Sequence, residues 1–179
     1  LDEITIMDSA GTMTPAQVEE YVSKMVRRVT IPVAFHGHNN LGLSVANAMA
    51  AQKAGAEILD CGLMGMARSA GNCATELAAA VFQRYGAMEY VDLYALLDFI
   101  DKELAPAMEG VYHAPVKPQD LVYGLAGCHS NFAKLFEAVA QEKGVHLYKL
   151  IAEVSKIDRK APTRELIEQV ADRRKEAED

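Results

Sequence analysis

Cysteine, positive charge and long apolar runs are all scarce in this sequence of 179 residues. The three cysteines are scattered along the chain, and their number and spacing fit neither a disulfide framework nor a zinc knuckle. We therefore expect a reducing, cytoplasmic compartment. They are Cys61, Cys73 and Cys128. The net charge of -7 argues against binding to a nucleic-acid backbone. No apolar stretch is long enough to cross a bilayer and no signal peptide is recognisable, so we expect no membrane association.

What the sequence does contain is a regular alternation of short apolar runs and helical segments. The apolar runs, each followed by polar residues, are residues 3–7, 31–35 and 56–59. Helices are expected between and after them: one that opens with a capping box at Thr14-Pro15-Ala16-Gln17, one from about residue 43 to Gly55, and one from about residue 74 to Gly86. Strands that alternate with helices predict a parallel sheet in an α/β fold.

The alternation stops after Gly86, and helical patterns follow one another. Helices are expected at residues 92–105, 119–144 with a break near Gly127, 147–157 and from 163 onward, with a proline-containing loop at 111–118. The charged segment 164–179 is expected to be a solvated helix or a frayed tail. We therefore expect an α/β domain over residues 1–110 and a helical domain over residues 111–179.

Two histidines one residue apart, His36 and His38, follow the second apolar run. Successive side chains of a strand point to opposite faces, so both rings are expected on one face. Two imidazoles on one face can supply nitrogen ligands to a divalent metal ion. The alternative is a pair of polar histidines satisfied at the edge of a sheet.

Further polar residues follow the other strands. They are Asp8, Ser9, Asn39, Asp60 and Asn72. Strand ends of this kind converge at the C-terminal rim of α/β barrels, where active sites form. Either Asp8 or Asp60 is a candidate for the carboxylate of a two-His, one-carboxylate set, which suits Mn²⁺, Fe²⁺, Co²⁺ or Zn²⁺ and the binding of a 2-oxo acid. The alternative for Asp8, Asp60 and Ser9 is a structural role as a turn residue or a helix cap.

The glycine-rich segment 62–72 is expected to be a long loop that covers the site or shapes access to it. Glycine loops before helices also bind phosphate. This segment has neither the Walker A nor the G-x-G-x-x-G spacing, which weakens the phosphate alternative.

Three motifs together resemble the metal-dependent pyruvate aldolase/lyase superfamily, whose catalytic domain is a TIM (β/α)8 barrel. They are Ile6–Gly11, Phe35–Leu43 and Ala70–Glu76. The segment Tyr123–Phe132 is similar to the C-terminal helical domain of one branch, the 4-hydroxy-2-oxovalerate aldolases. The resemblance covers about residues 3–155. It implies an α/β fold made of the C-terminal half of a TIM barrel followed by a small all-helical domain.

The resemblance also implies a site and a reaction. A divalent metal, first of all Mn²⁺, would be held by His36 and His38, with Asn72 at a position that ligates metal in related lyases. A small-molecule 4-hydroxy-2-oxo acid such as 4-hydroxy-2-oxovalerate would be cleaved to pyruvate and an aldehyde. Ser9 matches a residue near the pyruvate carboxylate. His129 stands where the aldolases place a tyrosine that faces the substrate, so we expect a catalytic role, with a structural histidine as the alternative.

The resemblance also implies partners, and some catalytic residues of the family have no counterpart in this sequence. The family pairs with an acylating aldehyde dehydrogenase, and open sheet edges of a partial barrel favour a homo-oligomer. The family's opening strand carries an Arg-Asp pair and, soon after, a catalytic His, and none of these has a counterpart here. We therefore expect this chain to be a partial barrel, either because the rest of the polypeptide is absent or because two half-barrels dimerise. We expect the chain alone to bind metal weakly and to lack aldolase activity.

Two other classes remain open at this point. One is a different enzyme of the same superfamily, such as an acyl-CoA lyase or a 2-isopropylmalate-type synthase. The other is a non-catalytic half-barrel that serves as a regulatory or assembly module.

Overall fold

The structure is a computed structural model that describes residues 1–108 and 118–178. It divides into two compact units, Leu1–Val116 and Lys117–Asp179. The domain boundary expected between residues 110 and 111, and nearly all of the loop expected at residues 111–118, lie outside the described residues. Each unit is therefore considered by itself.

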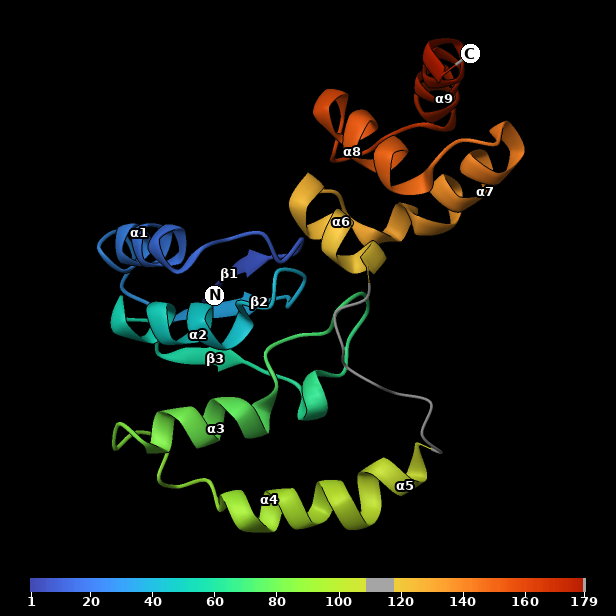
Figure 1. The fold of residues 1–179 in the computed structure, drawn as a ribbon. Helices are drawn as coiled ribbons and strands as arrows, with labels where there is room; N and C mark the ends of the chain where they lie inside the picture. Colours follow the sequence, from blue (N-terminus) through green and yellow to red (C-terminus); the bar gives the residue numbers. More distant parts are fainter. Residues whose placement is uncertain (109–117, 179) are drawn as a thin grey trace. The chain divides into compact units, whose positions relative to one another are not determined.

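The first unit is built on a parallel sheet, drawn in blue and teal in Figure 1. Within the described residues, the sheet has the strand order β1-β2-β3. The strands are β1 (Ile4–Asp8), β2 (Val33–Gly37) and β3 (Ile58–Asp60). The helices that follow them are α1 (Pro15–Val26), α2 (Ser44–Lys53) and α3 (Thr75–Gln83). The parallel α/β arrangement expected from the sequence is confirmed.

Each strand ends one or two residues later than its apolar run. The reason is that polar residues at the ends still pair: Met7 lies opposite His36, and His36 lies opposite Asp60. The ladder therefore carries His36 inside β2 rather than just after it, which fixes the direction of its side chain.

Local signals in the sequence mark the start of α1 and the end of α2. The Thr14 side chain accepts from the Gln17 amide while the Gln17 side chain caps the Thr14 amide, so the expected capping box at α1 is present. Gly55 follows α2 with φ of 101°, a left-handed conformation that glycine adopts without steric cost.

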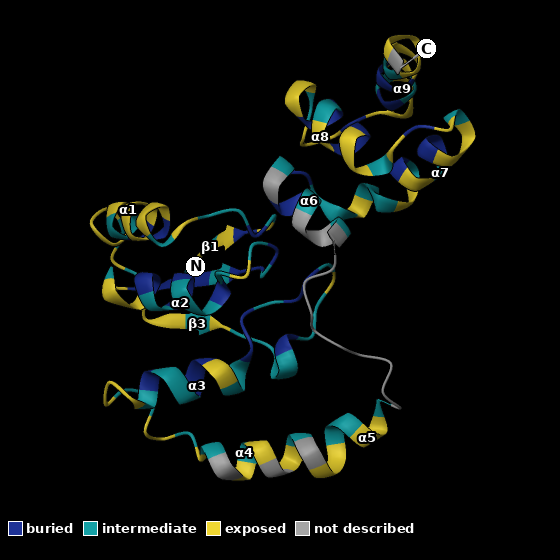
Figure 2. Cartoon of the chain, in the orientation of Figure 1, coloured by how far each residue is buried: buried dark blue, intermediate teal, exposed yellow. Residues whose placement is uncertain are grey.

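The core of the first unit lies between the sheet and its helices. Val33 and Phe35 of β2 are buried against Val18 and Val22 of α1, with Ala51 of α2 completing the cluster. A second cluster joins α2 to α3 around Ala48, Cys73, Ala78 and Phe82. Small residues on α2 allow the helix to lie close to its neighbours, and Figure 2 shows its buried stretches in dark blue.

The other elements in the described part of the first unit, up to residue 108, are helical turns and helices. The elements are η1 (Leu63–Gly65), α4 (Leu93–Phe99), the π-helical turn η2 (Ile100–Leu104) and α5 (Ala105–Ala107). The helix expected at residues 92–105 is confirmed, and the Asp92 carboxylate caps it by accepting from the Ala95 amide at 3.0 Å.

The second unit is helical throughout its described residues. Its elements are α6 (Pro118–Ala126), the 3-10 turn η3 (Ser130–Phe132), α7 (Ala133–Lys143), α8 (Leu147–Ile157) and α9 (Arg164–Glu178). Phe136, Leu150, Ile151 and Val154 form the centre of its core. None of the helices described in either unit is long and apolar enough to span a membrane.

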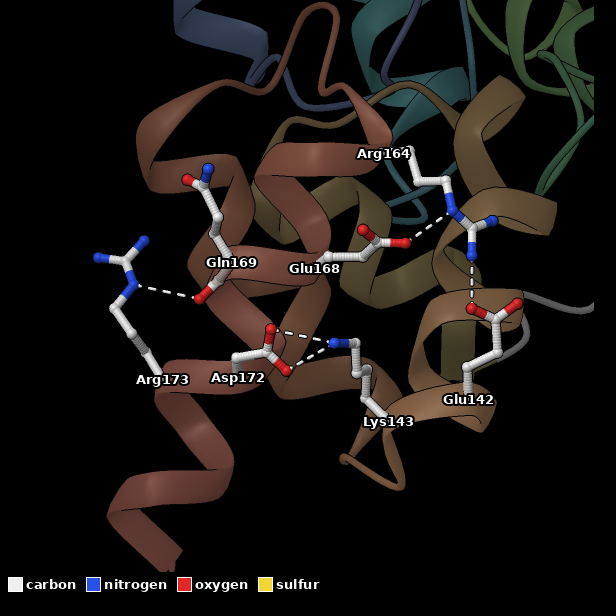
Figure 3. Close-up of polar contacts among 7 residues, drawn as sticks. All are labelled: Glu142, Lys143, Arg164, Glu168, Gln169, Asp172 and Arg173. Carbon is white, nitrogen blue, oxygen red and sulfur yellow. Dashed lines mark hydrogen bonds and ion pairs between the residues drawn. The ribbon is translucent and has the colours of Figure 1, made fainter.

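The helix α9 corrects one expectation. A solvated helix or frayed tail was expected, but Ile167, Val170 and Ala171 are buried in the core of the second unit. Their spacing of three and four residues forms one apolar face of the helix. The ion pairs of Figure 3, such as Lys143 with Asp172 at 2.7 Å, lie outside this face. Because exposed ion pairs contribute little, the apolar face is what holds α9 in place.

Candidate metal centre

The rings of His36 and His38 lie together. Their centroids are 5.3 Å apart and their planes meet at 77°. This is the arrangement that strand alternation predicts for residues separated by one position. The two imidazoles therefore form a single group of nitrogen donors.

Asp60 orients the ring of His36. The two residues are directly opposite each other on neighbouring strands, and His36 Nδ1 lies 2.7 Å from Asp60 Oδ2. A carboxylate only accepts, so the His36 ring donates its Nδ1 proton. A carboxylate behind a metal-binding histidine is a common arrangement, because it fixes the tautomer and makes the other nitrogen more basic. In this structure Asp60 Oδ2 is engaged with the His36 ring.

A backbone carbonyl orients the ring of His38. Its Nδ1 lies 3.3 Å from the carbonyl oxygen of Gly71, which also accepts from the Asn39 amide at 2.8 Å. The residue is buried, with 4% of its surface exposed. Burial, helped by the positive charge of Arg68 and by His36, lowers the pKa of His38. The lowered pKa favours the neutral ring, which is the form that binds a metal ion.

Asn72 meets His38 across an isolated antiparallel bridge. Its Oδ1 atom is buried and has no hydrogen-bond partner within the described part of the chain. A buried polar atom without a partner is costly and calls for an explanation, such as a ligand that the protein binds. An amide oxygen is a donor type that a divalent cation accepts together with imidazole nitrogens.

Asp8 does not belong to this donor group. Its carboxylate is buried and accepts from the backbone, Oδ1 from the Thr12 amide and Oδ2 from the Met13 amide, each at 3.0 Å. Both oxygens are used to hold the turn after β1, so the turn alternative describes Asp8. Over residues 1–108 and 118–178, no three His, Cys, Asp or Glu side chains are grouped as a metal site.

The loop at residues 62–72 contacts His38 through the Gly71 carbonyl. Several of its backbone amides donate within the chain: Met64 to the Glu76 carboxylate, Gly71 to the Arg68 carbonyl and Asn72 to the Gly65 carbonyl. A phosphate cradle needs such amides to be available, so this geometry disfavours the phosphate alternative. The loop instead presents the Gly71 carbonyl to His38.

Ser9 and His129 lie in different units. Ser9 is exposed immediately after β1, at the end of the sheet that carries His36. His129 precedes η3 in the second unit, and its Nδ1 accepts from the Asn131 amide at 3.1 Å. The structure brings His36, His38 and Asn72 together within the first unit, while the roles expected for Ser9 and His129 stay predictions.

The two asparagines after His38 make hydrogen bonds that hold the surrounding backbone and loop. Asn39 Oδ1 accepts from the Ser44 amide at the start of α2 at 3.2 Å, so the residue expected at the strand end with the other polar side chains has a structural contact. Asn40 Nδ2 donates to Ser69 Oγ at 2.7 Å. Both partners lie beyond the immediate neighbours in the sequence, and no local pattern points to them.

Comparisons with known proteins identify the family of the chain. Residues 2–102 match the HMGL-like family, and the chain belongs to that family. It is 42% identical over 144 residues to a 4-hydroxy-2-oxovalerate aldolase of Pectobacterium atrosepticum, which covers 80% of this chain and 41% of that protein. It is 38% identical over 153 residues to the enzyme of the same name from Desulfitobacterium hafniense, with 86% and 45% covered. The chain spans less than half the length of these curated relatives.

A solved structure supports the fold independently. The N-terminal domain of an aldolase candidate from Bacteroides vulgatus superimposes with a TM-score of 0.68 at 26% identity. The superposition covers 78% of this chain and 45% of that one. The resemblance to the aldolases and the α/β fold class are thereby confirmed, and the chain corresponds to part of such an enzyme.

Proposed function

We propose that this chain is part of a divalent-metal-dependent aldolase that cleaves 4-hydroxy-2-oxo acids, such as 4-hydroxy-2-oxovalerate, to pyruvate and an aldehyde. The observation that carries the proposal is the pair of adjoining imidazoles, each held through Nδ1, at the end of β2. The aldolase names of the relatives support the reaction class.

The residues that would hold the cation are His36, His38 and Asn72. With each Nδ1 donating to an oxygen, the Nε2 atoms are left as the metal-binding nitrogens. Mixed nitrogen and oxygen donors suit Mn²⁺ and its neighbours in the first transition row, and Mn²⁺ is our choice. When bound, such an ion supplies Lewis-acid stabilisation of the negative charge that develops on a 2-oxo acid as its carbon–carbon bond breaks.

The protein's own groups have separate tasks. Asp60 and the Gly71 carbonyl fix the tautomers and directions of the two rings. The exposed Ser9 hydroxyl is proposed to donate to the substrate carboxylate. Nδ1 of His129 accepts a hydrogen bond from the Asn131 amide. In the neutral form of the ring, the proton is therefore on Nε2. That tautomer suits the proton-donating role proposed for His129 in place of the family's tyrosine.

A carboxylate ligand is still needed, and Asp8 and Asp60 are both engaged elsewhere. We propose that it comes from outside these 179 residues, so that the chain alone binds metal weakly and lacks aldolase activity. A homo-oligomer and an acylating aldehyde dehydrogenase partner remain part of the proposal. The positions of β1 and β3 at the edges of the described sheet support association with further strands.

A chimera tests the function. This chain replaces the matching segment of the Pectobacterium atrosepticum aldolase, and pyruvate release from 4-hydroxy-2-oxovalerate is followed with lactate dehydrogenase and NADH in the presence of Mn²⁺. We expect turnover by the chimera, none by the isolated chain, and none by the chimera with His38→Ala.

Two controls make the result specific. The His146→Ala chimera removes a histidine that is exposed in the second unit, and it should keep full activity. An acyl-CoA lyase assay runs in parallel. A folded, metal-loaded chimera that cleaves an acyl-CoA substrate but no 4-hydroxy-2-oxo acid would contradict the proposal and favour another branch of the superfamily.

A further inference from the structure

Two cysteines that are distant in the sequence lie side by side in the first unit. Gly62 and Ala74 form an isolated parallel bridge, with the Gly62 amide donating to the Cys73 carbonyl at 3.0 Å. One position earlier on each side stand Cys61 and Cys73. Neighbouring strands are about 4.8 Å apart. That spacing falls inside the Cα–Cα range of disulfides, about 4.4–6.8 Å.

The two sulfurs differ in their access to solvent. Cys73 is 2% exposed, whereas Cys61 is partly exposed, and both are free thiols. Because it is the more exposed of the two, Cys61 is the sulfur that an oxidant in solution reaches first. The neighbouring Cys73 thiol also lowers the pKa of Cys61.

We propose that Cys61 and Cys73 form a reversible disulfide when the protein meets a hydroperoxide. The Cys61 sulfur attacks one oxygen of hydrogen peroxide, the O–O bond breaks, and a sulfenic acid and one water result. The Cys73 sulfur then attacks the Cys61 sulfur, the S–O bond breaks, and the hydroxide leaves with the thiol proton as a second water. Two thiols lose two electrons and the peroxide gains them. A small dithiol reverses the reaction by exchange.

A disulfide between Cys61 and Cys73 would lie next to residues that contact the two histidines. Cys61 directly follows Asp60, which orients His36, and Cys73 directly follows Asn72, which bridges to His38. The bond would close the loop at residues 62–72 at its base and join the two segments that support the histidines. This modification site stands whether or not the histidines bind a metal.

Trypsin offers a direct test, because Arg68 lies between the two cysteines. The reduced 179-residue chain is treated with hydrogen peroxide, its remaining thiols are alkylated, and it is digested without reductant. We expect peptides 54–68 and 69–84 as one linked species, two hydrogens lighter than their sum, that separates with dithiothreitol. Cys128→Ser should give the same product, whereas Cys61→Ser and Cys73→Ser should not.

A rate comparison separates the folded geometry from chance encounter along the chain. Since the fold holds the sulfurs together, we expect linkage at least about tenfold faster in native buffer than in concentrated urea. Equal rates would overturn the proposal. So would linkage to Cys128, linkage between two chains, or oxidation of Cys61 that stops at the sulfenic or sulfinic acid.

Discussion

Replacement of Asp60 by alanine separates metal binding from folding. The carboxylate contacts His36 Nδ1 at 2.7 Å, but 56% of the Asp60 side chain is exposed. Because water screens a carboxylate that is more than half exposed, the contact with His36 contributes at most about 1 kcal/mol to folding. Asp60→Ala should therefore lower the free energy of unfolding only slightly.

The effect on the metal should be larger. Loss of a carboxylate behind a metal-binding histidine weakens affinity by about 10- to 100-fold. That factor corresponds to about 1.4 to 2.7 kcal/mol of binding free energy. The excess over the folding effect arises because His36 loses the carboxylate that fixes its tautomer and the direction of its ring.

Mn²⁺ titration of the chimera, with the free ion followed by electron paramagnetic resonance, measures the affinity, and urea denaturation measures the stability. Glu57→Ala is the matched control, because it removes one exposed negative charge just before the same strand, β3. An affinity for Asp60→Ala within twofold of that for Glu57→Ala would refute the role assigned to Asp60.

Three further substitutions test the fold. Thr14→Ala removes the α1 cap that binds the Gln17 amide, and should cost about 0.5–2 kcal/mol in urea denaturation. Gly11→Ala should destabilise by at least about 1 kcal/mol, because φ is 62° and a Cβ would lie 2.7 Å from the Asn40 amide nitrogen; a melting temperature equal to the parent's would contradict this. Phe136→Ala should cost about 3–5 kcal/mol, because the side chain is fully buried; its unfolding is followed by circular dichroism, with the exposed Tyr148→Ala as comparison.

Much of the fold could be predicted because its signals are local. The capping box at Thr14 and the left-handed Gly55 depend on residues a few positions apart, and both mark helix ends in the structure. The shared face of His36 and His38 follows from strand geometry alone. The helix α9 shows the limit: its many charges suggested solvent, although Ile167 and Val170 carry the periodicity that buries it.

The rest of the site depends on contacts between distant segments. Asp60 was predicted as a ligand or a turn residue, and only the register of β2 against β3 shows that it faces His36. The cysteines were predicted to be scattered thiols, and only the bridge of Gly62 with Ala74 brings two of them together. Tertiary pairing of this kind has no period or motif that a single sequence displays.

The two rings differ in how evolution can adjust them. His36 depends on a side chain, so one codon change at Asp60 can alter the strength of its support. His38 depends on the Gly71 main chain, which every substitution leaves in place unless the loop itself is remodelled. For the cation site proposed above, drift among homologues should therefore change the affinity through His36, while the position of His38 stays constant.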